Sequence, residues 1–451
     1  MNFTKFFNFK GVLLGAAIFA IIIAVLGFSG KIPIFNSKSE QKLTGNIVIW
    51  GTIPYSSMAE FSDVFNKEAK TYTMTYKEVD YKEINSKLIS ALADGVAPDL
   101  ILAPSDIALA NVGRVFPVST ASIPESTFRN TFADISNILI SMPYGYVGLP
   151  VSVDPLVLYY NRDILSSNGF AEAPKTWSDL YRYEEKITKE NTNGDITLST
   201  IAFGTYDNIP HISDILLTLI LQQGQTPVAQ AVGRDIDGNS AYVYNVLTDQ
   251  SVNAGGLSPL NSALAFTKDF SDTQKSTYNW NAKSNNALSD FVSGNLAFYI
   301  GYASEASYIK SANQKLYFDY TYIPQVEGSK TSATYGRLYT IFMLRTSPNQ
   351  NLAYQVMIAL ATGPLSQNLV AMTGGVSALK SNIASAISSG DQGAEIFGNS
   401  VLISKNFYDL HRENLEILMR EAIRQVYNGE KSTVEASSEF TENLQAVYTG
   451  E

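Results

Sequence analysis

Early in this chain two hydrophobic periods alternate, and this alternation restricts the fold more than any other feature. Three segments have the period or the short apolar run of a strand: Asn46–Trp50, Tyr72–Tyr76 and Asp99–Ala103. Between them, Met58–Phe65 and Ile84–Leu92 place apolar residues at helical spacing. The order strand, helix, strand, helix, strand predicts an α/β fold with a parallel sheet and helices on both of its faces.

The ends of these strands are the first places to look for a binding site. In open α/β sheets, ligands bind beyond the carboxyl ends of the strands. Two segments follow such ends, Gly51–Tyr55 after the first strand and Pro104–Asp106 after the third. They supply four candidate ligand-binding residues: Thr52, Tyr55, Ser105 and Asp106.

The amino-terminal segment Gly11–Phe28 is apolar and uncharged. As a helix rising ~1.5 Å per residue it would extend ~27 Å, close to the ~30 Å hydrocarbon core of a bilayer. Lys5 and Lys10 precede it, so the positive-inside rule keeps the short amino terminus in the cytoplasm and places the folded part outside. The run "VLGFSGK" only approximates a signal-peptidase site, which favours an uncleaved anchor over a removed signal. We expect a cytoplasmic segment at 1–10, a transmembrane anchor or signal at 11–29 and a linker at 30–45.

Composition excludes several classes of function. The net charge is -10 and no cluster of Lys and Arg provides the basic stripe that phosphate backbones require, so we expect no nucleic-acid partner. The chain has no cysteine and only two histidines, His211 and His411, which lie far apart in the sequence. Thiolate metal sites are therefore excluded, and we expect neither a metal ion nor a cofactor.

Motifs of the common catalytic sites are absent from the sequence. There is no Gly-x-Ser-x-Gly, no His-Glu-x-x-His, no phosphate-binding loop and no Gly-x-Gly-x-x-Gly. A chain with two histidines and no cysteine offers few pairs of nucleophile and base. Two carboxylates for glycoside hydrolysis could come from any part of the chain, so a secreted carbohydrate-active enzyme stays an alternative.

Two extended apolar pieces between residues 144 and 161 are interrupted by Pro150 and by Asp154-Pro155. Proline removes a hydrogen-bond donor and is excluded from the interior of most strands. We therefore expect the chain to bend here and to cross from one lobe to another.

The run Gly148–Leu180, "GLPVSVDPLVLYYNRDILSSNGFAEAPKTWSDL", resembles the signature of extracellular solute-binding proteins of ABC importers, in the branch that binds maltose and multiple sugars. Its elements are a Gly-x-Pro strand, an acidic residue, a Tyr-Asn-x-Asp and a Pro-x-Thr-Trp that opens a helix. Further segments resemble the same family in the same order: "ALADGVAPDLIL", "FVSGNLAFYIG", the stretch from Ser347 to Ser381, and "AIRQVYNGEKSTVEASSEF". The resemblance covers about Asn46 to Val447.

The resemblance implies a two-lobed periplasmic-binding-protein fold with a hinge cleft, which captures a solute and catalyses no reaction. We expect a monomer that delivers a sugar or oligosaccharide to the permease subunits of an ABC transporter. The expected lobes are 46–152 with 300–345, and 153–299 with 346–451. Three alternatives stay open: a binder of another solute such as a peptide, polyamine or sugar phosphate, the carbohydrate-active enzyme named above, and a surface adhesion protein.

Two acidic residues fall where the family places sugar contacts, Asp106 after the third strand and Asp154 at the crossing. A carboxylate can accept hydrogen bonds from two sugar hydroxyls, which suits both positions. Each has an equally good structural explanation. Asp106 could cap a helix that starts at Ile107, and Asp154 could form the turn before Pro155.

Aromatic faces stack on sugar rings, which makes Tyr55, Trp280 and Tyr302 candidates, whereas Trp50 and Trp177 are expected to pack in the core. Maltodextrin-binding members often carry a tryptophan after the late strand. Here the sequence is "GYASEAS", with Tyr302, Ser304 and Glu305 at this place, which argues against long maltodextrins but not against sugars in general. Weaker candidates are Arg337, which could equally serve an anionic ligand, and Gly375 in a Thr-Gly-Gly turn.

Overall fold

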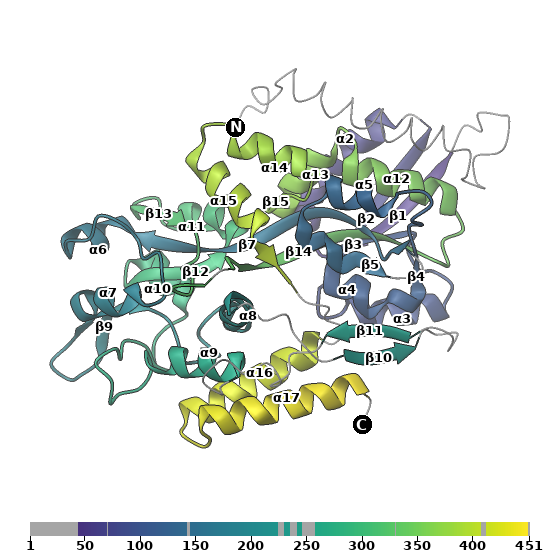
Figure 1. Ribbon diagram of the computed structural model, residues 1–451. Helices are drawn as coiled ribbons and strands as arrows, with labels where there is room; N and C mark the ends of the chain where they lie inside the picture. Colours follow the sequence, from purple (N-terminus) through teal and green to yellow (C-terminus); the bar gives the residue numbers. More distant parts are fainter. Residues whose placement is uncertain are drawn as a thin grey trace. The chain divides into compact units, whose positions relative to one another are not determined.

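A computed structural model describes residues 44–69, 71–141, 145–223, 230–234, 241–245, 258–329, 331–406 and 412–449 (Figure 1). The expected cytoplasmic segment 1–10 and anchor 11–29 lie outside these residues, as does almost all of the linker 30–45. The described chain divides into two compact units. The first ends at Asp154 and also contains Arg337–Ser385, and the second comprises Pro155–Gly336 with the residues after Ser385.

The first unit is built on the predicted alternation of strands and helices. Its elements up to the first crossing are β1 (Gly45–Gly51), α2 (Tyr55–Glu68), β2 (Tyr72–Glu78), α3 (Ile84–Ala93), β3 (Leu100–Pro104), α4 (Ser105–Ala110), β4 (Val115–Phe116), α5 (Glu125–Thr131), β5 (Ile140–Ser141) and β6 (Gly145–Tyr146), with 3-10 turns at Val112–Arg114 and Asp134–Leu139. The later ones are α12 (Gln350–Thr362), α13 (Ser366–Thr373), β15 (Val376–Ser377) and α14 (Lys380–Ile387).

The sheet of the first unit follows the order β2, β1, β3, β14, in which β1 runs parallel to β2 and β3, and β14 (Thr334–Leu344) runs antiparallel to β3. Ile47 and Ile49 of β1 are buried because helices cover the sheet. Helix α12 contacts β1 and α13 contacts α2 on one face, and Figure 1 shows α3 and α4 on the other. The parallel α/β arrangement expected from the alternating periods is confirmed.

The second unit contains a mixed sheet and a large helical layer. Its elements are β7 (Leu149–Asn161, shared with the first unit), α6 (Arg162–Ser167), α7 (Asp179–Ile187), β8 (Lys189–Glu190), β9 (Ile196–Ile201), α8 (Ile212–Gln222), β10 (Gln230–Arg234), β11 (Ala241–Asn245), α9 (Pro259–Lys268), α10 (Ala287–Ser293), β12 (Leu296–Tyr302), a 3-10 turn (Ala303–Glu305), α11 (Ala306–Ala312), β13 (Phe318–Thr321), α15 (Gln392–Leu402), β16 (Ser404–Lys405), α16 (Arg412–Tyr427) and α17 (Thr433–Thr449).

Strand β7 pairs with β13 and with β12, both antiparallel, and β12 continues the sheet by pairing in parallel with β9. Helix α8 lies at the centre of this unit and all of its eleven residues are buried, because α9 and α16 pack on it. Helix α17 packs in turn on α16 and α9, as Figure 1 shows at the yellow end of the chain. The core of the second unit includes Trp177 and Trp280.

The predicted break of the chain at two prolines is wrong, because β7 is one strand of 13 residues that runs through Pro150 and Pro155. At Pro155 the strand changes partners. Val153 pairs with Val376 of β15, and Leu156 pairs with Tyr302 of β12. Pro155 lies between these two pairings. Its missing N–H therefore removes no hydrogen bond from either strand pair.

The division into units differs from the expected lobes in two stretches. Residues 300–336 belong to the second unit and not to the first, because β12 and β13 both pair with β7 there. Residues 346–385 belong to the first unit and not to the second, because α12 contacts β1 and α13 contacts α2. The first crossing lies at Asp154–Pro155, within two residues of the expected boundary after 152.

Among the described residues no single helix is both long and apolar enough to cross a membrane. Helices α12 and α13 reach the required length and apolar composition only when they are taken together, and the chain bends by 75° between them.

Candidate functional site

The carboxyl ends of β1, β2 and β3 meet at one edge of the first unit's sheet. Two hydrogen bonds join the segments that follow them: the Val79 N–H donates to the Gly51 carbonyl at 2.9 Å, and the Tyr76 hydroxyl donates to the Ile53 carbonyl at 2.6 Å. Burial raises the pKa of Tyr76 above its ordinary value, so this phenol stays protonated and keeps donating. The predicted segment Gly51–Tyr55 is therefore joined to β2 and to the residue that follows β2.

Asp106 lies in the first turn of α4, directly after β3. Its carboxylate accepts a hydrogen bond of 2.5 Å from the hydroxyl of Tyr81, which follows β2. The helix begins one residue before Asp106 and not after it, and no side chain caps it. The capping explanation of Asp106 is therefore wrong. The structure ties this carboxylate to the segment after β2, which is separated from β3 by β1 in the sheet.

The other candidate residues at these strand ends differ in how far their side chains are exposed to solvent. Tyr55 is 56% exposed at the start of α2, and its N–H donates to a Glu78 carboxylate oxygen at 2.7 Å. The Thr52 hydroxyl oxygen is buried and has no hydrogen-bond partner among the described residues. Such an orphaned hydroxyl costs free energy unless a ligand or water pairs with it. Ser105 is only 3% exposed, so its side chain belongs to the interior.

Asp154, Arg337 and Gly375 belong to the first unit near the residues where the chain crosses to the second. Asp154 lies in β7 and is 4% exposed, so the alternative of a turn before Pro155 is wrong. Gly375 precedes the residue that pairs with Val153, and a Cβ at this position would come within 2.9 Å of the Val153 carbonyl oxygen. Glycine is thus required for the close approach beside Asp154. Arg337 lies in β14 and is partly exposed.

The second unit has an equivalent edge, where the neighbouring parallel strands β9 and β12 end. His211 closes the segment after β9, and Glu305 closes the turn after β12. The His211 Nε2 atom lies 2.7 Å from a Glu305 carboxylate oxygen, and the Tyr299 hydroxyl donates to the other oxygen at 2.8 Å. Burial, followed by the Glu305 charge, raises the pKa of Tyr299 well above its ordinary value, so this donor keeps its proton.

His211 adopts a left-handed conformation with φ of 59°, and no other described residue except glycine has a positive φ. This conformation costs free energy for residues other than glycine and is concentrated at functional positions. The side chains of His211 and Glu305 are 20% and 19% exposed, so both reach the surface only in part. The strained backbone and the shared hydrogen bond mark this pair as a candidate part of a binding site.

A network of charged side chains around the buried Asp214 lies beside this edge. Tyr302, whose ring meets that of His211 at 4.7 Å, donates to the buried Asp214 carboxylate at 2.6 Å. Arg412 forms ion pairs with Asp214 and Glu416 and donates to the Tyr335 hydroxyl at 3.1 Å. Helices α8 and α16, strand β12 and the first residues of β14, which belong to the second unit, are thereby fixed to one another.

Two aromatic candidates are corrected by burial. Trp280 is fully buried and its indole N–H donates to Asn208 at 3.2 Å, and Tyr302 is 1% exposed. Neither ring presents a face to a ligand in this structure, so both act as packing and support residues. Ser304 is partly exposed in the turn before Glu305. Trp50 and Trp177 are buried as expected, at 6% and 4% exposure.

His211 and Glu305 are not among the ligand contacts predicted from the sequence. Glu305 lies in the "GYASEAS" segment at the end of the predicted late strand, so the rule of strand ends could have selected it. His211 could not be selected, because the strand Ile196–Ile201 that precedes its segment was not predicted. The sequence of this strand, "ITLSTI", shows only a weak alternation of polar and apolar residues.

Comparison with known proteins finds sugar-binding proteins among those that are similar to this chain. A Bacillus subtilis (strain 168) protein, the maltodextrin-binding protein MdxE, is 27% identical over 177 residues, and this match spans only 38% of the present chain and 39% of that protein. The sugar-binding protein MalE from Xanthomonas citri has a similar fold, with a TM-score of 0.70 at 19% identity over 90% of this chain and 98% of that one.

A second solved structure, the maltose/maltodextrin-binding domain MalE from Bdellovibrio bacteriovorus bound to maltotriose, gives a TM-score of 0.64 at 17% identity, over 89% and 99% of the two chains. These structures confirm the expected two-lobed α/β solute-binding fold. The family of bacterial extracellular solute-binding proteins matches residues 60–393, well over half of the chain. The resemblance seen in Gly148–Leu180 is therefore confirmed, and this chain belongs to the family of bacterial extracellular solute-binding proteins.

Proposed function

We propose that this protein captures a short oligosaccharide outside the cytoplasm and delivers it to the permease of an ABC transporter. The observation that carries the proposal is the same in both units: partly exposed polar groups gather where parallel strands of one sheet end, at Tyr81 and Asp106 in one and at His211 and Glu305 in the other. Carboxylates, hydroxyls and an imidazole are the donors and acceptors that sugar hydroxyls require. The sugars named for the relatives support the same class of ligand.

The proposed ligand contacts in the first unit are Thr52, Tyr55, Asp106, Asp154, Arg337 and Gly375. Tyr55 is the exposed aromatic residue of this set and would stack on a sugar ring. The unpaired Thr52 hydroxyl would regain a hydrogen bond from a sugar hydroxyl. In the second unit His211, Ser304 and Glu305 would make the corresponding contacts.

A short ligand is favoured over a long maltodextrin. No tryptophan follows β12, and the aromatic residues Trp280 and Tyr302 of the second unit are buried. Long maltodextrins need successive stacking faces, because each ring buries its apolar patch against an aromatic side chain. We propose that Tyr55, as the exposed aromatic residue among the candidate contacts, together with a polar edge in the second unit, suits a ligand of very few sugar rings.

The proposed anchor is the apolar segment 11–29, which would hold the binding unit at the outer face of the cytoplasmic membrane. Separation of membranes from the soluble fraction of expressing cells, together with the amino-terminal sequence of the mature protein, tests it. A mature protein that starts near Gly30 and is released in soluble form would refute the anchor and leave the binding proposal unchanged.

The function is tested by a thermal-shift screen of the 451-residue chain in mild detergent against glucose, maltose, maltotriose, maltoheptaose, a polyamine, a peptide mixture and glucose 6-phosphate. A ligand at about 100 times its Kd adds ~2.7 kcal/mol to the free energy of unfolding and raises Tm. We expect maltose or maltotriose to raise Tm more than maltoheptaose does. A shift by a non-sugar only would refute the sugar proposal, and slow hydrolysis of a bound sugar would refute the pure binding role.

A further inference from the structure

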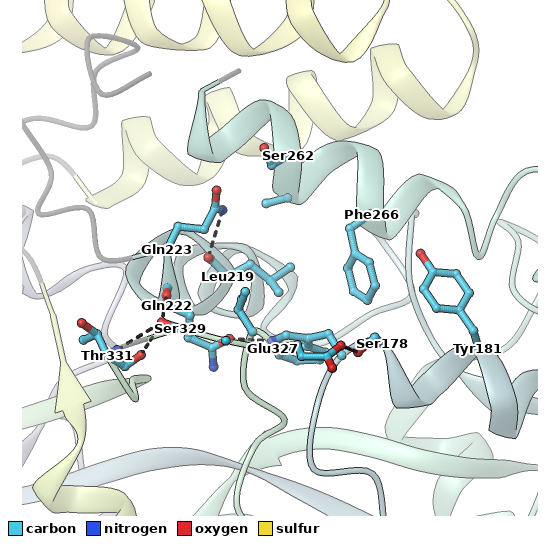
Figure 2. Close-up of a pocket in the computed structure, with 14 residues that line it drawn as sticks. Ser178, Tyr181, Leu219, Gln222, Gln223, Ser262, Phe266, Glu327, Ser329 and Thr331 are labelled. Atoms are coloured by element: carbon cyan, nitrogen blue, oxygen red, sulfur yellow. Dashed lines mark hydrogen bonds between the residues drawn. The ribbon is translucent and has the colours of Figure 1, made fainter. Parts of the chain in front are cut away.

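The second unit contains a hollow of about 800 Å³ that lies apart from the candidate site (Figure 2). It is lined by residues at the start of α7, in the last turn of α8, in α9, at 326–329 and at Thr331. Leu219 and Gln222 contribute from α8, whereas His211 precedes the first residue of that helix. An eleven-residue helix at ~1.5 Å per residue separates the two places by ~16 Å. The volume lies in the range of small-molecule pockets, about 300–1,000 Å³.

Aromatic rings from two segments, Trp177 and Tyr181 at the start of α7 and Phe266 in α9, line one end of the hollow. The ring centroids of Trp177 and Phe266 are 5.8 Å apart with an angle of 66° between their planes, and those of Tyr181 and Phe266 are 6.3 Å apart at 85°. Figure 2 shows the rings of Phe266 and Tyr181 beside each other in the wall, with Leu219 further along it. Tyr181 is 39% exposed. The faces of aromatic rings carry negative potential and attract cations.

The carboxylate of Glu327 also lines the hollow. One oxygen of Glu327 accepts a hydrogen bond from the Ser178 hydroxyl at 2.8 Å, and no Lys or Arg among the described residues forms an ion pair with it. Two acidic residues close in sequence to the lining residues are paired: Glu172 lies 2.8 Å from Lys175, and Asp269 lies 3.6 Å from Lys275. Among the described residues that line the hollow, Glu327 is therefore the charged group that an incoming cation would meet.

The polar groups deeper in the wall are already satisfied within the protein. The Gln222 amide accepts from the Trp177 indole N–H at 2.6 Å and donates to the carbonyls of Pro324 and Ala333 at 2.9 and 2.8 Å. The Ser329 hydroxyl donates to the Gln222 carbonyl at 2.8 Å. A sugar needs several open donors and acceptors, and this wall offers mainly aromatic faces and one carboxylate.

We propose that this hollow is a second binding site, for a small organic cation with an apolar body. The apolar part lies against Phe266, Tyr181 and Leu219, and the cationic group pairs with Glu327. The class includes aromatic amines and quaternary ammonium compounds, which aromatic walls recognise through cation–π attraction. The site is independent of the proposed sugar binding, because its residues contribute nothing to the candidate sugar contacts.

The probe for the test is benzyltrimethylammonium chloride, titrated at constant ionic strength into the 451-residue chain, with calorimetry and tryptophan fluorescence as readouts. Benzyl alcohol is the neutral comparison. We expect saturable binding of the cation, weaker binding of the alcohol, and a Kd raised about fivefold or more by Glu327→Gln, the scale of one cation contact. Because Trp177 lines the hollow, Trp177→Phe should remove most of the fluorescence change.

Glu172→Gln is the matched control, because it removes an exposed carboxylate of the neighbouring segment that is paired with Lys175 and does not line the hollow. It should leave the Kd of the cation unchanged. Equal affinity of the parent and the Glu327→Gln protein, or equal affinity for the cation and the alcohol, would overturn the proposal. The absence of saturable binding would also overturn the proposal. That result is expected if another part of the chain already fills the hollow. Sugar-induced thermal shifts should persist in Glu327→Gln.

Discussion

The His211 imidazole lies 2.7 Å from the Glu305 carboxylate, although the two residues are 94 positions apart in the sequence. The contact joins the ends of two neighbouring parallel strands, β9 and β12, and the hydroxyl of Tyr299 holds the second Glu305 oxygen. It fixes both polar groups at the edge of the second unit. A ligand that binds there meets a preorganised donor and acceptor, which lowers the entropy cost of binding.

His211→Ala should weaken binding of the ligand found in the screen by about tenfold, equivalent to about 1.4 kcal/mol, because a hydrogen-bonding group of the proposed site is removed. Calorimetric titration measures it. His211→Asn is the control for backbone strain, since asparagine tolerates the left-handed conformation that His211 adopts at φ of 59°. If both variants bind as tightly as the parent protein, His211 does not contact the ligand.

Asp106→Ala should reduce affinity about tenfold or more while leaving Tm unchanged, because a hydrogen bond to a charged group is worth about 1.5–3 kcal/mol. Tyr81→Phe removes the hydroxyl that orients Asp106 and should have a smaller effect of the same sign. Glu83→Gln serves as the control, since Glu83 is exposed and pairs with Lys87 on α3. A Tm that falls with affinity would show that Asp106 supports the fold and not the ligand.

Arg412→Met should lower the free energy of unfolding by about 3–5 kcal/mol, because it leaves the buried Asp214 carboxylate without its cation. Urea titration followed by tryptophan fluorescence measures the loss. Arg424→Met provides the comparison: Arg424 pairs with Glu421 and Glu430 on the surface, where such pairs contribute about 0–1 kcal/mol. Adding Asp214→Asn to Arg412→Met should recover part of the loss, and no recovery would contradict the assigned pairing.

Glu184→Gln should stabilise the protein more near neutral pH than in mild acid. Burial in α7 raises the pKa of Glu184, so the folded state holds the proton more tightly than the unfolded state does. The resulting penalty is absent below the unfolded pKa and grows as pH rises through the folded pKa. The difference in Tm between variant and parent, measured across this range, checks the sign. A pH-independent difference would mean that the folded and unfolded proteins bind the Glu184 proton equally.

Much of the fold and part of the candidate site could be predicted from the sequence. The strands Gly45–Gly51 and Leu100–Pro104 follow from their apolar runs, and the rule that ligands bind at strand ends selects Thr52 and Asp106 from the order of strands and helices alone. Periodicity is a local property, so it is readable from neighbouring residues. The same local reading failed at Pro155, where the strand continues because it changes partners.

By itself, the sequence determined the alternating α/β architecture and the membership of the family, because both depend on short patterns along the chain. Only the tertiary structure decided which polar groups meet. His211 and Glu305, or Asp214 and Arg412, are brought together by strand pairing and helix packing across long stretches of chain. It also decided that Trp280 and Tyr302 are buried, since the burial of a ring depends on what packs around it and not on the residues beside it in the sequence.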